Sequence, residues 1–444
     1  MAPGAPGANA IWTPADNEGF GTSTTTASRV WYTLEHGRLT EVYYPNLGTP
    51  SIRDLQVVIA RPVRAPRALD RRRAAGRAAV GRRVSLRAEP RVKRNVMDTA
   101  ELGPFTVSRI CLGAMFFGTK TPAEESHRML DRFRDAGGNF VDTADVYGDG
   151  ESERTLAPWL ARHRDEVVLA TKVRMRVSDP PGEGLAPERI RAACDASLKR
   201  LGVDAIDLYQ VHAPDPDVPL EESLEALDGL VQAGKVRALG ASNFPAWLLA
   251  WAVAMQDREG WAPFLSLQPQ YSLVERSIEV EILPFCRAAG IGVIPWGPLG
   301  AGFLTGKYAR DSEPPPGSRM AEAGDEIEEA RHRRAVGRNF RVVDEARAIA
   351  EAKGATIPQV ALAWMLGVDG IVAPIVGPRT FEQLEDLLGA VDVTLDDDER
   401  ARLERHAAPP EMYPQRMLHE QVGLPRITPP LRRERATAAA GGEG

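Results

Sequence analysis

The stretch FVDTADVYGDGESE, residues 140–153, decides the fold because it leaves a hydrophobic strand abruptly. Phe140 belongs to an apolar run, and Asp142 and Tyr147 follow it before two glycines. Asp and Gly end many strands, so these residues could simply form a turn. In a parallel α/β barrel, however, reactive groups lie just beyond the carboxyl ends of the strands. The pattern of the remaining chain has to separate these two interpretations.

Strand-like and helix-like segments alternate from Met97 to about Leu424. In LEESLEALDGLVQAGK, residues 220–235, apolar side chains recur at helical spacing and Gly234 ends the helix. Eight βα units in succession predict an α/β fold, a (β/α)8 TIM barrel over residues 97–424. A doubly wound sheet is the alternative, but LGAMFFGTK lacks the glycine spacing of its phosphate turn. The expected strands are SRICLGAM, NFVDTA, EVVLATK, AIDLYQVH, VRALGAS, FLSLQPQ, IGVIPWG and GIVAPIVG.

The barrel is preceded by a basic segment of unusual composition. The net charge of the chain is −6, yet residues 60–96 carry twelve Arg and one Lys against one Asp and one Glu. This Arg-, Ala- and Pro-rich segment has little apolar surface to bury, so we expect a disordered linker. The remainder of the chain is strongly acidic, which argues against nucleic acid as a partner. We also expect disorder in the tail, residues 425–444.

Three cysteines, widely spaced, suggest neither a disulfide framework nor a zinc site, and they fit a reducing compartment. The start MAPGAPGANA has no basic end and no apolar core, so it does not resemble a secretory signal. The sequence contains no apolar run of about 18 residues, the length needed to span a membrane. These features predict a cytoplasmic protein without a membrane partner.

Residues 1–59 form a separate β-rich region. The sequence RVWYTLEHGRLTEVYYP has two runs rich in Val, Thr, Tyr and Trp around Glu35, His36 and Gly37, which predicts a hairpin. The longer stretch GFGTSTTTASRVWYTLEHGRLTEVYYPNLGTPSIRDLQVVI resembles the N-terminal β-sandwich domain of glucoamylase- and glucodextranase-type glycoside hydrolases, over residues 9–59. Fifty residues are too few for a sandwich core, so the resemblance implies a remnant or a fusion fragment.

Three weaker motif matches are rejected. The glycines from Gly297 to Gly306 are one residue short of a P-loop, and Tyr308 replaces its Ser or Thr. The segment GASNF lacks the second glycine of a nucleophile elbow. The seven histidines contain no HExxH arrangement, so we expect no metal site.

Ionisable side chains follow consecutive expected strands at the rim that barrel strands share. The second strand ends at Asp142, with Tyr147 five residues on, and the next two end at Lys172 and His212. One such lysine is commonly a solvated charge, but four ionisable groups of different type indicate a site. The motifs DTADVYGDGESE, ATK, LYQVHAPD and VRALGASNF are similar to those of the aldo-keto reductase superfamily over residues 97–418. Within it, the chain looks most like bacterial reductases akin to the potassium-channel β-subunits.

The resemblance implies the reversible reduction of an aldehyde or ketone to an alcohol. It places the catalytic tetrad on Asp142, Tyr147, Lys172 and His212. Tyr147 would donate the proton, and a nicotinamide cofactor would donate the hydride because no side chain can. A Lys172 ammonium about 4 Å from the phenol contributes roughly 4 kcal/mol, so we expect it to lower the Tyr147 pKa by up to about three units. Asp142 would hold Lys172 in place, and His212 would direct the carbonyl oxygen and share its proton.

The resemblance also implies a cofactor site. Ser242, Asn243 and Gln268 would hold the nicotinamide carboxamide, and Trp296 would stack on the nicotinamide ring, although by itself Trp296 reads as a core residue. Arg379 suits a 2′-phosphate through charge-assisted hydrogen bonds, so we expect NADPH, with NADH possible. The other expected cofactor residues are Pro298, Leu299, Gly300, Gly302, Leu304 and Lys307 over the pyrophosphate, with Gly377, Arg379 and Gln383 at the adenosine end.

One residue departs from the family pattern. The family usually has an adenine-contacting Asn where this chain has Leu387, so adenine binding is expected to be weaker or to use Asp386. Loops near Met115 and Phe116, at 177–184 and at 311–334 should shape the pocket for a small carbonyl substrate. The charged loop 312–338 could act as a lid or could simply be mobile.

Two other functions remain open at this point. A cofactor-binding regulatory module with little turnover is possible, as in the channel β-subunits. A glycan-binding or glycoside hydrolase role through residues 1–59 is the other alternative. The sequence specifies neither the carbonyl substrate nor the oligomeric state.

Overall fold

The chain is described by a computed structural model whose well-placed residues fall into two compact units. We describe each unit by itself. The ranges 60–96 and 425–444, for which the sequence predicts disorder, lie outside the described residues. The description covers three strands before residue 44 and residues 97–310, 312–323, 330–409 and 412–423.

The first unit contains a three-stranded antiparallel sheet in the order β1-β2-β3. Its Val-, Thr- and Tyr-rich segments favour extended backbone. Glu35 at the end of β2 pairs with Arg38 at the start of β3, which confirms the hairpin expected around His36 and Gly37. The elements of this unit are β1 (Gly19–Thr25), β2 (Ser28–Glu35), β3 (Arg38–Tyr43) and α13 (Gln415–Glu420).

The second unit is an eight-stranded parallel sheet in the order β14-β13-β12-β11-β8-β7-β6-β15. The order follows the chain except at β15, the last strand, which pairs with the first, β6. The strands are β6 (Cys111–Gly113), β7 (Phe140–Asp142), β8 (Val168–Val173), β11 (Ile206–Val211), β12 (Val236–Ser242), β13 (Phe264–Gln268), β14 (Gly292–Val293) and β15 (Ile375–Val376).

Backbone hydrogen bonds join the two ends of this sheet. The amide of Val372 donates to the carbonyl oxygen of Val293 at 2.8 Å, and the amide of Ile375 donates to that of Pro295 at 2.9 Å. A parallel bridge between Val293 and Ile371 lies beside them. The sheet therefore closes into the (β/α)8 barrel that the sequence predicts, and no strand edge is left unpaired there.

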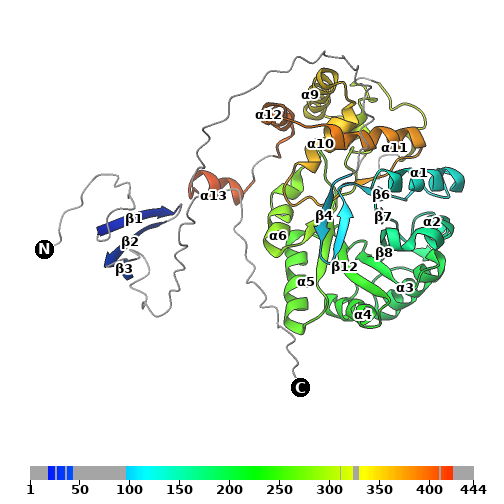
Figure 1. Ribbon diagram of the computed structural model, residues 1–444, viewed down its shortest axis with the longest axis horizontal. Helices are drawn as coiled ribbons and strands as arrows, with labels where there is room; N and C mark the ends of the chain where they lie inside the picture. Colours follow the sequence, from blue (N-terminus) through cyan, green and yellow to red (C-terminus); the bar gives the residue numbers. More distant parts are fainter. Residues whose placement is uncertain are drawn as a thin grey trace, which may run out of the picture. The chain divides into compact units, whose positions relative to one another are not determined.

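Helices follow the barrel strands and cover their outer side (Figure 1). Their apolar stripes pack on the strands, as Leu224 and Leu227 of α4 do with full burial. Gly234, with φ 72°, takes the left-handed conformation just beyond that helix, as expected. The covering helices are α1 (Ala123–Asp135), α2 (Glu151–His163), α3 (Pro187–Leu201), α4 (Leu220–Gln232), α5 (Ala246–Glu259), α6 (Ile282–Ala289), α10 (Ile357–Leu366) and α11 (Phe381–Leu388).

A hairpin before the first barrel strand fills the amino end of the barrel, and the sequence analysis did not predict it. Its strands are β4 (Thr99–Leu102) and β5 (Phe105–Ser108). Leu102 and Val107 join an apolar cluster inside the barrel with Phe140, Leu208 and Ile294. Gly292 permits this approach, because a Cβ there would lie 2.5 Å from a methyl carbon of Leu102.

The connection from β14 to β15 is the longest of the barrel. It carries α7 (Arg319–Ala323), α8 (Arg331–Arg334) and α9 (Gly337–Lys353) before α10, and α12 (Asp397–Ala407) packs on α9 later in the chain. Among the described residues, we find no helix with the length and apolar character needed to cross a membrane.

Candidate active site

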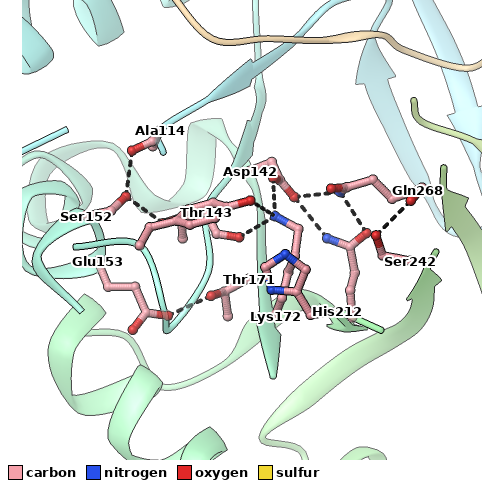
Figure 2. A network of polar contacts seen from close by, with 12 residues as sticks. Ala114, Asp142, Thr143, Ser152, Glu153, Thr171, Lys172, His212, Ser242 and Gln268 are labelled. Atoms are coloured by element: carbon pink, nitrogen blue, oxygen red, sulfur yellow. Dashed lines mark hydrogen bonds and ion pairs between the residues drawn. The ribbon is translucent and has the colours of Figure 1, made fainter. Parts of the chain in front are cut away.

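Lys172 lies on strand β8 of the barrel, and its ammonium forms an ion pair with the Asp142 carboxylate. Its Nζ donates to Asp142 Oδ1 at 2.5 Å and to the carbonyl oxygen of Thr143 at 2.8 Å (Figure 2). Both side chains are almost fully buried. Burial alone would lower the pKa of Lys172, but the charge of Asp142 and the hydrogen bonds to Asp142 and Tyr147 outweigh it, and the net pKa is raised. Lys172 is therefore a fixed cation at neutral pH.

Tyr147 reaches the same ammonium from the turn after β7. Lys172 Nζ lies 3.2 Å from the phenol oxygen of Tyr147 and 4.8 Å from the centre of its ring. Burial raises the pKa of Tyr147 and outweighs the lowering effect of Lys172, with a smaller upward contribution from Asp142. The net lowering expected from the sequence is therefore wrong, because that argument counted the charge and omitted desolvation. Tyr147 is a neutral phenol, able to donate a proton, throughout the physiological range.

His212 stands beside Tyr147 at the end of β11. The two rings meet edge to face, with centroids 5.8 Å apart and an interplanar angle of 86°. Burial, together with the charges of Lys172 and Arg174, lowers the pKa of His212 to about 3. Its Nδ1 has no hydrogen-bond partner among the described residues. His212 is therefore a neutral imidazole, which can orient a carbonyl oxygen but is not itself a charged acid.

The residues expected to bind the nicotinamide carboxamide form one hydrogen-bonded group. Ser242 Oγ donates to the carbonyl oxygen of Gln268 at 2.7 Å and accepts from Asn243 Nδ2 at 3.0 Å. Gln268 Nε2 donates to Asp142 Oδ2 at 3.0 Å, so this group is linked directly to the tetrad (Figure 2). Asn243 has a φ of 58°, and its Oδ1 accepts from Trp296 Nε1 at 3.0 Å.

A cavity of about 870 Å³ opens at the carboxyl ends of the strands. This volume lies toward the upper end of the range for ligand pockets, roughly 300–1,000 Å³. Lys172, Gly300 and Leu304 are buried and do not line it. The predicted residues that line it are Asp142, Tyr147, His212, Ser242, Asn243, Gln268, Trp296, Pro298, Leu299, Gly302, Lys307, Gly377, Arg379 and Gln383.

Two cations line the cavity near each other: Lys307, which the sequence assigns to the pyrophosphate, and Arg379, which it assigns to the adenosine end. Burial and the nearby charge of Arg379 lower the pKa of Lys307. Arg379 stacks over Phe116 at 4.7 Å and pairs with Glu322 at 3.2 Å, and Lys120 also pairs with Glu322. The backbone amide of Arg379 donates to Gln383 Oε1 at 2.8 Å. This end of the cavity is suited to an anionic group.

Leu387 lines the same end of the cavity, together with Asp386. Asp386 Oδ1 already accepts from Thr356 Oγ1 at 2.8 Å and from Gln359 Nε2 at 3.1 Å. The apolar Leu387 thus offers van der Waals contact where the family pattern has an amide.

Sequence reasoning missed several residues of the site. Gln210 is fully buried and donates to Asp142 Oδ2 at 2.9 Å, so that both oxygens of this carboxylate are engaged. Its position two residues before His212, on the same side of a strand, was the available signal. Met175 and Arg319 also line the cavity. Arg319 lies within the expected loop 311–334, whereas Met175 precedes the expected loop 177–184 and was not predicted. No cluster of three or more metal-binding side chains occurs in the part of the chain that the structure describes.

Comparison with known proteins agrees with this geometry. Residues 109–408 match the aldo/keto reductase family. The chain is 39% identical over 302 residues to the uncharacterised oxidoreductase YrpG of Bacillus subtilis, covering 65% of this chain and 89% of that protein. It is 35% identical over 319 residues to norsolorinic acid reductase stcV of Emericella nidulans, covering 68% and 79%. An aldo-keto reductase of Fusarium vanettenii is 33% identical over 352 residues, covering 72% and 93%.

The chain therefore belongs to the aldo/keto reductase family and is an oxidoreductase with a (β/α)8 barrel. Residues 2–83 match a second family, the N domain of glucodextranase. That match bears out the resemblance seen in residues 9–59 and extends beyond it on both sides. The structure describes only the strands β1, β2 and β3 of this region.

Proposed function

We propose that this protein reduces an aldehyde or ketone to the alcohol with NADPH, with Tyr147 as the proton donor. The observation that carries the proposal is the position of Lys172, whose ammonium lies 2.5 Å from Asp142 and 3.2 Å from the Tyr147 phenol at the cavity wall. The family's usual cofactor is a nicotinamide dinucleotide, and the size of the cavity and the polar side chains in its lining fit such a group.

The tetrad would divide the work between proton donation and orientation. The bound cofactor would supply the hydride. Tyr147 would give its proton to the oxygen of the carbonyl, and Lys172 would stabilise the phenolate that remains. Asp142, held by Gln210 and Gln268, keeps the ammonium in place. The N–H of neutral His212 would hold the carbonyl oxygen toward Tyr147.

Replacement of Tyr147 by Phe tests this assignment. The variant should lose about 10²–10⁴-fold in kcat for NADPH-dependent aldehyde reduction, the usual contribution of a general acid. Its affinity for NADPH, measured by quenching of protein fluorescence, should stay within about twofold of the wild type. Wild-type binding of NADPH without turnover on a panel of aldehydes and ketones would instead favour the regulatory module.

We also propose that Arg379 selects NADPH over NADH. A charge-assisted hydrogen bond contributes about 1.5–3 kcal/mol, so Arg379→Ala should weaken NADPH binding roughly 10- to 100-fold. Binding of NADH should change little, because it lacks the 2′-phosphate. Arg128→Ala is a matched control, since Arg128 also stacks on a phenylalanine, Phe381, but does not line the cavity. An unchanged preference in the Arg379 variant would refute this part of the proposal.

A cytoplasmic location remains part of the proposal. It rests on Cys111, Cys194 and Cys286, which are buried free thiols and fit a reducing compartment. The expected partner is a small carbonyl compound.

A further inference from the structure

The turn that presents Tyr147 contains a second carboxylate outside the cavity. Asp145 lies two residues before Tyr147, between β7 and α2, and is only 1% exposed. Its backbone amide points to the carbonyl oxygen of Lys172 at 3.4 Å, a long contact. Asp145 is therefore close in sequence to Tyr147 and in contact with the backbone of Lys172, yet it does not line the cavity.

The charge partner of Asp145 is Arg189, in the first turn of α3. Arg189 Nη2 lies 3.7 Å from Asp145 Oδ2, and the guanidinium is 8% exposed. Among the described residues, no side chain hydrogen-bonds to either oxygen of Asp145, and no group accepts from any nitrogen of Arg189. The attraction of the two charges thus links Asp145 to α3 without a hydrogen bond.

In a neighbouring buried ion pair, Glu153 with Arg200, both carboxylate oxygens have hydrogen-bond partners. Glu153 accepts from Arg200 Nε at 2.7 Å and from Thr171 Oγ1 at 2.6 Å, so each of its oxygens has a partner. This second pair joins α2 to α3, and the hydrogen-bonding capacity of its carboxylate is used. The Asp145–Arg189 pair is longer, at 3.7 Å, and lacks such hydrogen bonds.

The groups around Asp145 bring its titration close to neutrality. Burial, reinforced by Glu153 on α2, raises the pKa of Asp145 to about 7 against the lowering effects of Arg189 and Arg200 on α3. The buried hydroxyl of Tyr209 on β11 also faces this group and has no hydrogen-bond partner among the described residues. The carboxylate is therefore the main form above pH 7 and the neutral acid the main form below it.

We propose that Asp145 is a positioning residue for Tyr147, whose turn is held against Lys172 by the ion pair of Asp145 with Arg189. This inference rests on the proposed role of Tyr147 as proton donor. Protonation of Asp145 removes the attraction and leaves Arg189 as a buried charge without a counter-ion, which is costly. The turn then becomes more mobile, and the contact between the Tyr147 phenol and the Lys172 ammonium is formed for a smaller fraction of the time.

Kinetics of Asp145→Asn and Arg189→Gln test the proposal. Each variant should lower kcat about tenfold with KM within twofold, and each should lose the transition near pH 7 in the kcat profile of the wild type. The double variant should be no worse than either single variant, because one interaction is removed in all three. Additive losses, or an unchanged profile in Asp145→Asn, would overturn the proposal.

Asp207→Asn is the matched control. Asp207 is equally buried and pairs with Arg164 and Arg237 at 2.8 Å, but it lies on β11 near the amino end of the barrel. The control should lower the melting temperature as the Asp145 variant does, while its pH profile stays like the wild type. A similar change of profile in both variants would mean that Asp145 has only a structural role.

Hydrogen exchange gives a readout that needs neither cofactor nor substrate. Amides of residues 143–150 in the wild type should exchange faster at pH 6 than at pH 8 after correction for the intrinsic rate. In Asp145→Asn they should exchange fast at both pH values. If the wild type reduced no carbonyl but showed this pattern, the proposed function would fail while the positioning of the turn would stand. Equal protection in wild type and variant at both pH values would overturn the positioning role.

Discussion

Burial and charge partners together set the protonation state of the side chains proposed to react. Lys172 keeps its proton because Asp142 and Tyr147 offset the cost of its desolvation. The same desolvation keeps Tyr147 protonated and His212 neutral, so a single environment yields one cation, one neutral acid and one neutral imidazole. A charge argument without burial predicts the wrong direction for Tyr147, as the sequence analysis did.

These directions predict the pH dependence of the reaction. Because the pKa of Tyr147 is raised above 10.0, its phenol stays protonated, and kcat for reduction should show no loss from this group until the pH exceeds 10. Alcohol oxidation needs the phenolate as base and should accelerate as the pH rises over the same range. His212, with a pKa of about 3, should contribute no transition near pH 6.5.

Initial rates in both directions between pH 5 and about 10.5 check this prediction. His212→Gln should reduce kcat but leave any transition near neutrality in place. Loss of that transition in the His212 variant would contradict the assignment of a neutral imidazole.

At the level of elements, the β4–β5 hairpin stabilises the barrel from the end opposite the cavity. Leu102 is 1% exposed and packs in the interior cluster with Phe140 and Leu208. Such a short hairpin is marginally stable alone, so its formation depends on the barrel that it fills. This dependence explains why local sequence patterns did not reveal it.

Leu102→Ala should therefore lower the free energy of unfolding by about 2–5 kcal/mol, the usual range for a buried leucine. Urea unfolding followed by circular dichroism measures the change. At temperatures where the variant is folded, kcat should equal that of the wild type, since the hairpin does not line the cavity. Thr99→Ala, at an exposed position of the same hairpin, should stay within about 0.5 kcal/mol of the wild type.

At the level of the whole molecule, the barrel brings together residues far apart in the chain. Asp142 and Gln268 are 126 positions apart, yet Gln268 Nε2 lies 3.0 Å from Asp142 Oδ2. All residues that line the cavity lie between Gly113 and Leu387, within one compact unit.

Removal of residues 1–92 should for this reason leave kcat and the KM for NADPH within about twofold of the full-length values. Rates of NADPH oxidation by both chains at equal concentration would test this. A loss of more than tenfold, with the melting temperature unchanged, would show that the N-terminal region contributes to the reaction.

The sequence alone was enough to predict the barrel and to select the four ionisable residues. Alternating periodicity reports which face of each segment is buried, and strand ends in a barrel converge on one rim whatever the details of packing. The resemblance of short motifs also led to the expectation of a cofactor loop and of a cationic end near Arg379.

Only the tertiary structure decided the protonation states of those residues and the side chains that hydrogen-bond or pair with them. Desolvation depends on atoms from many segments, so neither the raised pKa of Tyr147 nor that of Asp145 follows from the local sequence. The same holds for Gln210 as a partner of Asp142 and for Arg189 as the partner of Asp145, because both contacts join residues that only the closed barrel brings within reach.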